Sequence, residues 1–290
     1  MPSNDAALNA PPSRHRGVIP RRASLTALLA VVATAVTVLG GTGLAQAARA
    51  EYVLECPEKS YSFRETTSPN GAVLRHHELR SGDIADNDKK YTDGRQRCEM
   101  IGRTEYPLQT NLWFAYSFRW TGEMPGGDRN WNVMTQLRQP LESGEPAGKP
   151  PAFTMRHVRG NLELATRSDT RKTTDTQVDE VVRRTLPWFP ANTWQNIVAR
   201  VRFDPFGNGR ITFWLNGREV YLSEPIPIGY NDSFGPHFSQ GQYRGATDAT
   251  TAFEFANVEF GTKSLLDRVA HPKPLPPLPE SARGTRPSGR

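Results

Sequence analysis

The sequence predicts an all-β fold, a two-sheet sandwich of the jelly-roll type, for the chain beyond residue 50. Short runs that alternate apolar and polar residues recur between Gly, Pro, Asn and Asp, and no helical period of 3.6 residues persists there. Eleven such runs joined by long connections suit two stacked sheets rather than one. In this architecture one sheet curves, so we expect a concave groove that would suit a polymer.

The first 50 residues have the pattern of an export signal. The basic residues Arg14, Arg16, Arg21 and Arg22 precede an apolar run, residues 25–44, and Ala-x-Ala cleavage candidates follow at 45–47 and 48–50. The adjacent arginines suit twin-arginine export as well as the general route. We expect a secreted chain without stable membrane association after cleavage. An uncleaved anchor is the alternative, because the apolar run approaches the about 20 residues that span a bilayer.

The charge balance limits the partners. The whole chain carries a net charge of +6, but without residues 1–50 the count is 31 basic against 29 acidic residues. Residues 263–290 hold six of these bases and two of the acids, which leaves 25 against 27 in between. Such a balance lacks the positive field that a nucleic-acid backbone requires. We therefore predict no nucleic-acid partner, and we expect a monomer.

The predicted organisation is a signal at 1–50, one β-rich domain at 51–262 and a tail at 263–290. About 210 residues suit a single domain of this class. The tail is rich in proline, which predicts disorder. Cys56 and Cys98 are the two cysteines, and an oxidising compartment favours a disulfide between them. Closing a loop of about 40 residues would contribute a few kcal/mol of stability.

The strands follow from alternation between turn residues. They are expected at 52–54, 73–80, 97–101, 112–120, 132–137, 153–158, 162–166, 195–203, 210–215, 218–222 and 253–260. The clearest hairpin surrounds Asn216-Gly217, the pair that a two-residue primed turn requires. Residues 139–151 are rich in Pro and Gly and predict a loop at the groove rim.

Two predicted strands carry polar pairs on one face. The period of two places Arg97 and Glu99 together and turns Cys98 to the opposite face. The same rule places Gln136 beside Arg138 in a segment that is otherwise apolar. Each pair either organises a polar sheet face or belongs to a binding site.

A third segment, residues 237–244, carries the remaining candidates. If it is extended, His237, Ser239 and Tyr243 share one face, and Gly241 leaves room for backbone or ligand to approach. A core tyrosine is the alternative for Tyr243.

In this order, the three segments resemble the signatures of jelly-roll polysaccharide lyases, the group that holds alginate lyases, glucuronan lyases and heparin lyase I-like proteins. Residues 77–83 ahead of Arg97-x-Glu99 resemble the family's Arg-rich strand and Gly-Asp turn, and residues 214–217 resemble its Trp-x-Asn-Gly hairpin. The resemblance covers roughly residues 73–260 and is nearest to the heparin lyase I-like and glucuronan lyase branch. It implies a concanavalin A-like sandwich and an acidic polysaccharide substrate.

The resemblance also implies the reaction, cleavage of a uronic-acid polymer by β-elimination. The proton on C5 is too weakly acidic while the adjacent carboxylate keeps its charge, so Gln136 and Arg97 would bind that carboxylate. Tyr243 would be the Brønsted group. Because an unperturbed tyrosine has a pKa near 10, Arg244 or Arg97 would have to lower the pKa of Tyr243.

The predicted substrate-binding residues are Arg138, Arg244, Glu99, His77 and His157. Two positions depart from the alginate lyase pattern, because Arg138 stands in place of a histidine and Ser239 in place of a lysine. The histidine that usually serves as base is thus missing there, and His77, His157 or His237 would have to substitute.

Other functions remain open at this point. A non-catalytic carbohydrate-binding module would use the same fold, and so would a glycoside hydrolase with two carboxylates, although the Glu-x-Asp-x-x-Glu strand of such hydrolases is absent. We expect no required cofactor. Calcium bound by Asp83, Asp86 and Asp88 would be structural. The periodicity of the strands does not distinguish glucuronate, mannuronate, guluronate and iduronate polymers.

Overall fold

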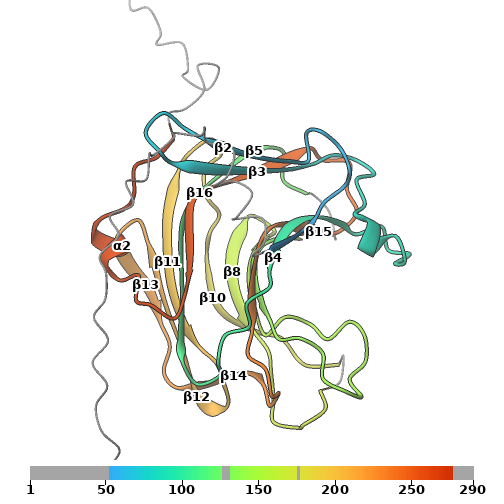
Figure 1. Cartoon of the computed structure of the whole chain (residues 1–290), viewed down its shortest axis with the longest axis vertical. Helices are drawn as coiled ribbons and strands as arrows, with labels where there is room; N and C mark the ends of the chain where they lie inside the picture. The colour runs from blue at the N-terminus through green and yellow to red at the C-terminus, as the bar shows by residue number, and fades with distance from the viewer. Residues whose placement is uncertain (1–51, 126–130, 175–176, 277–290) are drawn as a thin grey trace, which may run out of the picture. The chain divides into compact units, whose positions relative to one another are not determined.

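The computed structural model describes residues 52–125, 131–174 and 177–276, all of which belong to one unit of the chain (Figure 1). The predicted export signal at 1–50 and residues 277–290 of the predicted tail lie outside the described residues. No helix in the described ranges is long and apolar enough to cross a membrane.

The described strands form two sheets, which confirms the predicted all-β sandwich. The seven-stranded sheet has the order β1 (Tyr52–Glu55), β4 (Gln96–Gly102), β15 (His237–Arg244), β6 (Trp131–Arg138), β7 (Phe153–Val158), β8 (Asn161–Thr166) and β10 (Val181–Pro187). The nine-stranded sheet has the order β2 (Phe63–Thr67), β3 (Val73–Leu79), β16 (Thr251–Gly261), β5 (Asn111–Gly122), β11 (Gln195–Arg202), β12 (Asp204–Leu215), β14 (Ile226–Tyr230) and β9 (Ser168–Asp169), with β13 (Arg218–Leu222) also paired to β12.

The core fills the space between the two sheets. On β5 the alternate residues Phe114, Tyr116 and Phe118 are fully buried in it, as the period of two requires. The seven-stranded sheet contributes Met134 and Phe153 from β6 and β7. Each sheet therefore turns one face to the core and leaves the other face for solvent, a ligand or a covering segment.

The predicted hairpin joins β12 and β13. Asn216 and Gly217 have φ angles of 51° and 79°, the left-handed conformation that a primed turn demands. The predicted disulfide is also present, and it links Cys56, just after β1, to Cys98 on β4. Both features confirm local predictions from the sequence.

Five described strands are absent from the predicted ranges, namely β2, β9, β10, β14 and β15, although an extended conformation was considered for the segment that forms β15. All of these except β15 lie at or next to a sheet edge, and β10 exposes most of its residues to solvent. An edge strand buries little, so its sequence lacks the apolar alternation that identifies a strand.

Part of the predicted disordered tail is ordered. Residues 263–276 lie against the outer face of the nine-stranded sheet, where the short helix α2 (Asp267–Ala270) contacts β11 (Figure 1). Leu265 and Val269 pack against the stacked rings of Trp113 and Trp214. The two tryptophan rings on this outer face are stabilised when the tail covers them. The proline-rich composition of the tail does not reveal that it has this packing partner.

Candidate functional site

The candidate site lies on the face of the seven-stranded sheet that points away from the core. Strand β15 lies between β4 and β6, so Tyr243 pairs with Arg97 on one side and Ser239 pairs with Gln136 on the other. Because paired residues in neighbouring strands point to the same face, the three predicted segments share one surface. Segments more than a hundred residues apart in the sequence thus meet there.

A β-bulge adjusts the end of β15 that carries Tyr243. The register between β15 and β6 shifts between Gln240 and Tyr243. Gly241 lies at the shift with a φ angle of 143°, and a Cβ atom there would lie 2.2 Å from the carbonyl oxygen of Cys98. Glycine is therefore required for β15 to approach β4, and the bulge redirects Tyr243 relative to β6.

A cleft of about 320 Å³ opens on this surface. Its lining residues are Trp131, Val133, Gln136, Pro151, Thr154, Arg156, Val158, Arg167, Glu180 and Tyr243. A larger hollow of about 710 Å³ lies beside β1, and neither Gln136 nor Tyr243 lines it. The smaller cleft is therefore the one that combines two of the predicted catalytic residues.

Two guanidinium groups hold the phenol of Tyr243. Arg95 donates a hydrogen bond of 2.9 Å from Nη1 to the Oη atom, and the guanidinium of Arg97 lies 4.1 Å from the ring centroid. The ring of Trp131 packs against the same ring in a T-shaped arrangement, with the centroids 5.2 Å apart. Burial raises the pKa of Tyr243 above 10, although Arg97 and Arg95 pull it down. Burial therefore favours the neutral phenol over the phenolate.

Carboxylates surround Arg97 beneath the tyrosine. Arg97 donates from Nε to Asp88 at 2.8 Å and from Nη1 to Glu99 at 3.1 Å. Glu99 also accepts a 2.6 Å hydrogen bond from Nε2 of Gln136. Burial raises the pKa of Glu99 in spite of Arg97, and the side chain has no exposed surface. Glu99 therefore positions Arg97 and Gln136. The prediction that Glu99 binds substrate is wrong, because the buried carboxylate cannot contact a ligand directly.

Two other predicted substrate ligands lie in the core. Arg244 is fully buried and donates to Gln96 and to the carbonyl oxygen of Ala249, both at 2.7 Å, while burial lowers the pKa of Arg244 to about 10. His77 lies between the sheets with Nδ1 3.0 Å from the carbonyl oxygen of Cys98, and burial lowers the pKa of His77 to about 3. Strand alternation turns Arg244 away from Tyr243, so neither group reaches the cleft.

The other two histidines that were candidates for the base, His157 and His237, also lie away from Tyr243. His157 is buried on the core face of β7, where Nε2 accepts from the backbone N–H of Gly160, and burial lowers the pKa of His157 to about 4. His237 shares the outer face but lies six residues before Tyr243 on β15, which corresponds to about 20 Å. None of the three proposed substitutes for the missing base can act on the same bond as Tyr243.

Arg138 lies on the outer face opposite His237, as its predicted role requires. Within the described ranges no carboxylate pairs with its guanidinium. Its charge is therefore available to an anionic ligand at one end of the sheet surface.

The predicted calcium ligands do not converge. Asp83 accepts from the backbone N–H of Arg80, Asp86 pairs with exposed Lys89, and Asp88 holds Arg97. Among the described residues, the one group with three potential ligand atoms close enough to share a metal is Cys56, His77 and Cys98, whose sulfurs are joined as a disulfide. The three aspartates thus have separate structural partners.

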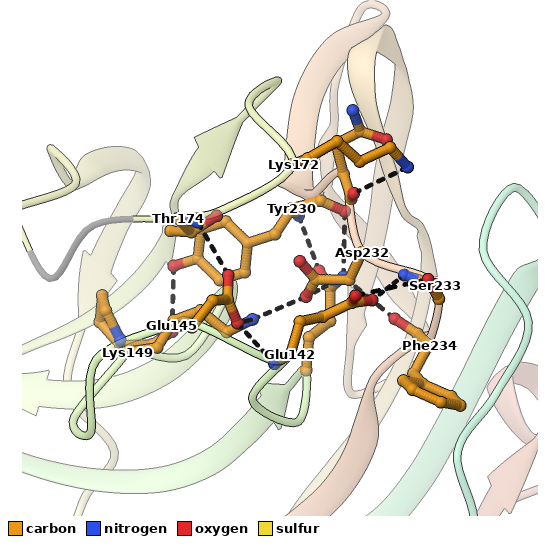
Figure 2. A network of polar contacts seen from close by, with 12 residues as sticks. Glu142, Glu145, Lys149, Lys172, Thr174, Tyr230, Asp232, Ser233 and Phe234 are labelled. Atoms are coloured by element: carbon orange, nitrogen blue, oxygen red, sulfur yellow. Dashed lines mark hydrogen bonds and ion pairs between the residues drawn. The ribbon is translucent and has the colours of Figure 1, made fainter.

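The rim loop predicted at 139–151 is held by a buried ionic network, shown in Figure 2. Lys149 is fully buried and binds both Glu145 of the loop and Asp232, which follows β14. Gln139 adds hydrogen bonds of 3.0 Å to Asp232 and to the carbonyl oxygen of Tyr230. Since Pro151 at the end of this loop lines the cleft, the network fixes one wall of the site.

Four residues at the site were missed by the sequence analysis, namely Arg95, Arg156, Arg167 and Glu180. The signal for Arg156 was present, since the period of two places it on the same face of 153–158 as Thr154. The other three lie outside the motifs, and only the pairing of distant segments brings them to the cleft.

Comparisons with known proteins agree with this architecture. The family model described as polysaccharide lyase matches residues 55–258. An endo-β-1,4-glucuronan lyase from the fungus Trichoderma reesei superposes with a TM-score of 0.56 at 14% identity, covering 73% of this chain and 96% of that one. A family 7 alginate lyase, A1-II′, superposes with a TM-score of 0.51 at 13% identity, covering 73% and 95%. At such identities these structures show a common fold. No curated protein sequence matches the chain.

Proposed function

Because the chain belongs to the polysaccharide lyase family, we propose that it cleaves a uronic-acid-containing polysaccharide by β-elimination, outside the cell and after loss of residues 1–50. The observation that carries this proposal is the presence of Tyr243 and Gln136 in one cleft, with Arg95 and Arg97 on the phenol. The glucuronan and alginate lyases of similar fold favour a uronic-acid substrate. Membership of a lyase family sets the glycoside hydrolase alternative aside.

The reaction needs one proton to be moved. Removal of the C5 proton forms an enolate-like intermediate, and expulsion of the C4 oxygen then forms the C4–C5 double bond while the leaving oxygen takes up a proton. Gln136 supplies an amide beside the reacting sugar, and Arg97 supplies positive charge beneath the ring of Tyr243. Preorganised groups of this kind stabilise the charge that develops on the sugar carboxylate.

In our proposal Tyr243 performs both proton transfers. As phenolate it takes the C5 proton, and the phenol so formed returns the proton to the departing oxygen. The nearest histidine on this face, His237, is about 20 Å away along the strand. Burial holds the pKa of Tyr243 above 10, so the reactive phenolate fraction grows with pH. We expect activity to rise with pH through the neutral and mildly alkaline range.

A single proton carrier has a stereochemical consequence. One phenol reaches both the C5 hydrogen and the C4 oxygen when the two lie on the same side of the sugar ring. That arrangement occurs in D-glucuronate and D-mannuronate, whereas L-guluronate and L-iduronate place them on opposite sides. We therefore propose that the substrate polymer contains glucuronate or mannuronate at the cleaved position.

The test is the ultraviolet absorbance of the unsaturated product, followed over time with residues 51–290. The panel comprises glucuronan, mannuronate-rich and guluronate-rich alginates, heparin, heparan sulfate, hyaluronan and pectate, each with and without calcium. A rise on glucuronan or mannuronate-rich alginate supports the proposal. A rise confined to guluronate-rich alginate contradicts the single-carrier mechanism. Binding without any absorbance would instead indicate a non-catalytic carbohydrate-binding module.

A further inference from the structure

The cleft contains a carboxylate of the protein itself, held by two arginines. Glu180, which directly precedes β10, accepts from Nη1 of Arg156 at 3.0 Å and also from Nη2 of the same guanidinium. Nη2 of Arg167 donates to Oε2 of the same carboxylate, the oxygen that also accepts from Nη1 of Arg156. All three residues line the cleft that holds Tyr243 and Gln136. Planar guanidinium groups bind carboxylates in this two-pronged manner wherever a carboxylate must be recognised.

The arginines are fixed independently of Glu180. Arg156 on β7 also binds Glu163, its direct cross-strand partner on β8, at 2.9 Å. Arg167 donates a second hydrogen bond to the carbonyl oxygen of Pro151 in the rim loop. Departure of Glu180 would therefore leave two oriented guanidinium groups with one remaining carboxylate, which is a net positive site for an anion.

Arg156 also lies at the level of the reacting tyrosine. Val133 pairs with Tyr243 on one side and with Arg156 on the other, so Arg156 lies two strands from Tyr243, about 10 Å across the sheet. Neighbouring sugars of a bound chain can span such a distance. The three charged side chains keep 17% to 21% of their surface exposed, so solvent and ligand can reach them.

We infer that Arg156 and Arg167 form a carboxylate-binding subsite for a uronate of the polymer, which Glu180 occupies in the free protein and which the substrate takes over by displacing it. This inference rests on the proposed function, and it goes further by assigning Glu180 as a side chain that competes with substrate for the subsite. The competition makes Glu180 a determinant of affinity for charged sugars. Neutral sugars gain nothing from the exchange, because they cannot replace the carboxylate between the two guanidinium groups.

The test measures binding by calorimetry in a Tyr243→Phe background, which prevents turnover. The probes are oligosaccharides of glucuronan and of mannuronate-rich alginate, together with their carboxyl-reduced forms. We expect Glu180→Gln to tighten binding of the acidic oligosaccharides about tenfold and Arg167→Gln to weaken it about tenfold, with no change for the reduced forms. Glu65→Gln is the matched control, because Glu65 pairs with Arg75 on the other sheet at a similar exposure, 17% and 16%.

The outcomes separate this inference from the proposed function. Unchanged or weaker binding by the Glu180→Gln variant overturns the inference, and so does a failure of every acidic probe to bind. Cleavage of a polymer by the parent protein together with unchanged binding by Glu180→Gln would overturn the inference alone. Tighter binding by Glu180→Gln without cleavage of any polymer would support the subsite and refute the lyase mechanism.

Discussion

Replacing Arg95 by glutamine tests the proposed role of Tyr243 most directly. Arg95 donates to the phenol oxygen at 2.9 Å, and its Nε atom donates to the two carboxylate oxygens of Asp93 at 2.9 and 3.0 Å, which holds the guanidinium in place. A permanently charged donor stabilises the phenolate more than the phenol. Loss of Arg95 therefore raises the pKa of Tyr243 further, and less of the reactive phenolate exists at any given pH.

The magnitude follows from the type of contact. A hydrogen bond from a charged donor contributes about 1.5–3 kcal/mol, and the 28% exposure of the Arg95 side chain places this one at the lower end. About 1.4 kcal/mol corresponds to a factor of ten. We expect kcat to fall about tenfold at neutral pH, with KM changed much less, and the rising limb of the pH–rate profile to move to higher pH.

The assay combines a pH–rate profile on the cleaved polymer with nuclear magnetic resonance titration of tyrosine labelled at Cζ. The resonance of Tyr243 is assigned by comparison with Tyr243→Phe. Arg171→Gln is the matched control, because Nε of Arg171 donates in the same manner to the carboxylate of Asp169, two residues earlier. An Arg95→Gln protein whose Tyr243 titration and pH profile coincide with those of the parent would refute the reasoning.

Three further results are expected. Tyr243→Phe should lower kcat at least 100-fold while oligosaccharide affinity stays within about threefold, as calorimetry would measure. Reduction of the Cys56–Cys98 disulfide, whose sequence separation is 42, should lower the free energy of unfolding by about 4 kcal/mol in urea denaturation. Burial lowers the pKa of His77 to about 3, so between pH 6.5 and 3 this side chain binds a proton in the unfolded chain but not in the folded protein. The free energy of unfolding should therefore fall as the pH drops through that range. It should fall less steeply in the His77→Gln variant.

The sequence predicted what depends on local pattern. Alternation of apolar and polar residues identified most of the central strands, because successive side chains of a strand between core and solvent point to opposite faces. Asn216-Gly217 identified its hairpin, because few residues adopt the left-handed conformation there. The ordered motifs around Arg97, Gln136 and Tyr243 identified the family, and the two cysteines identified the disulfide.

The period of two also predicted which residues share a face of a strand, but it did not predict which of the two faces is buried. Arg244 follows Tyr243 directly and was predicted to assist it, yet alternation turns Arg244 into the core, where it binds Gln96. His77 and His157 were candidates for the groove and lie in the core for the same reason. Burial depends on what the opposite sheet presents, which is information from distant parts of the chain.

Length, composition and local pattern thus determined the fold class, the position of the hairpin, the disulfide and the segments that carry the chemistry. Only the tertiary structure decided that Arg95 binds the phenol of Tyr243 and that Glu180 lies between Arg156 and Arg167. The physical reason is that local patterns act between near neighbours in the sequence. Strand register and sheet packing, which set the contacts of a site, arise from the free energy of the whole folded domain.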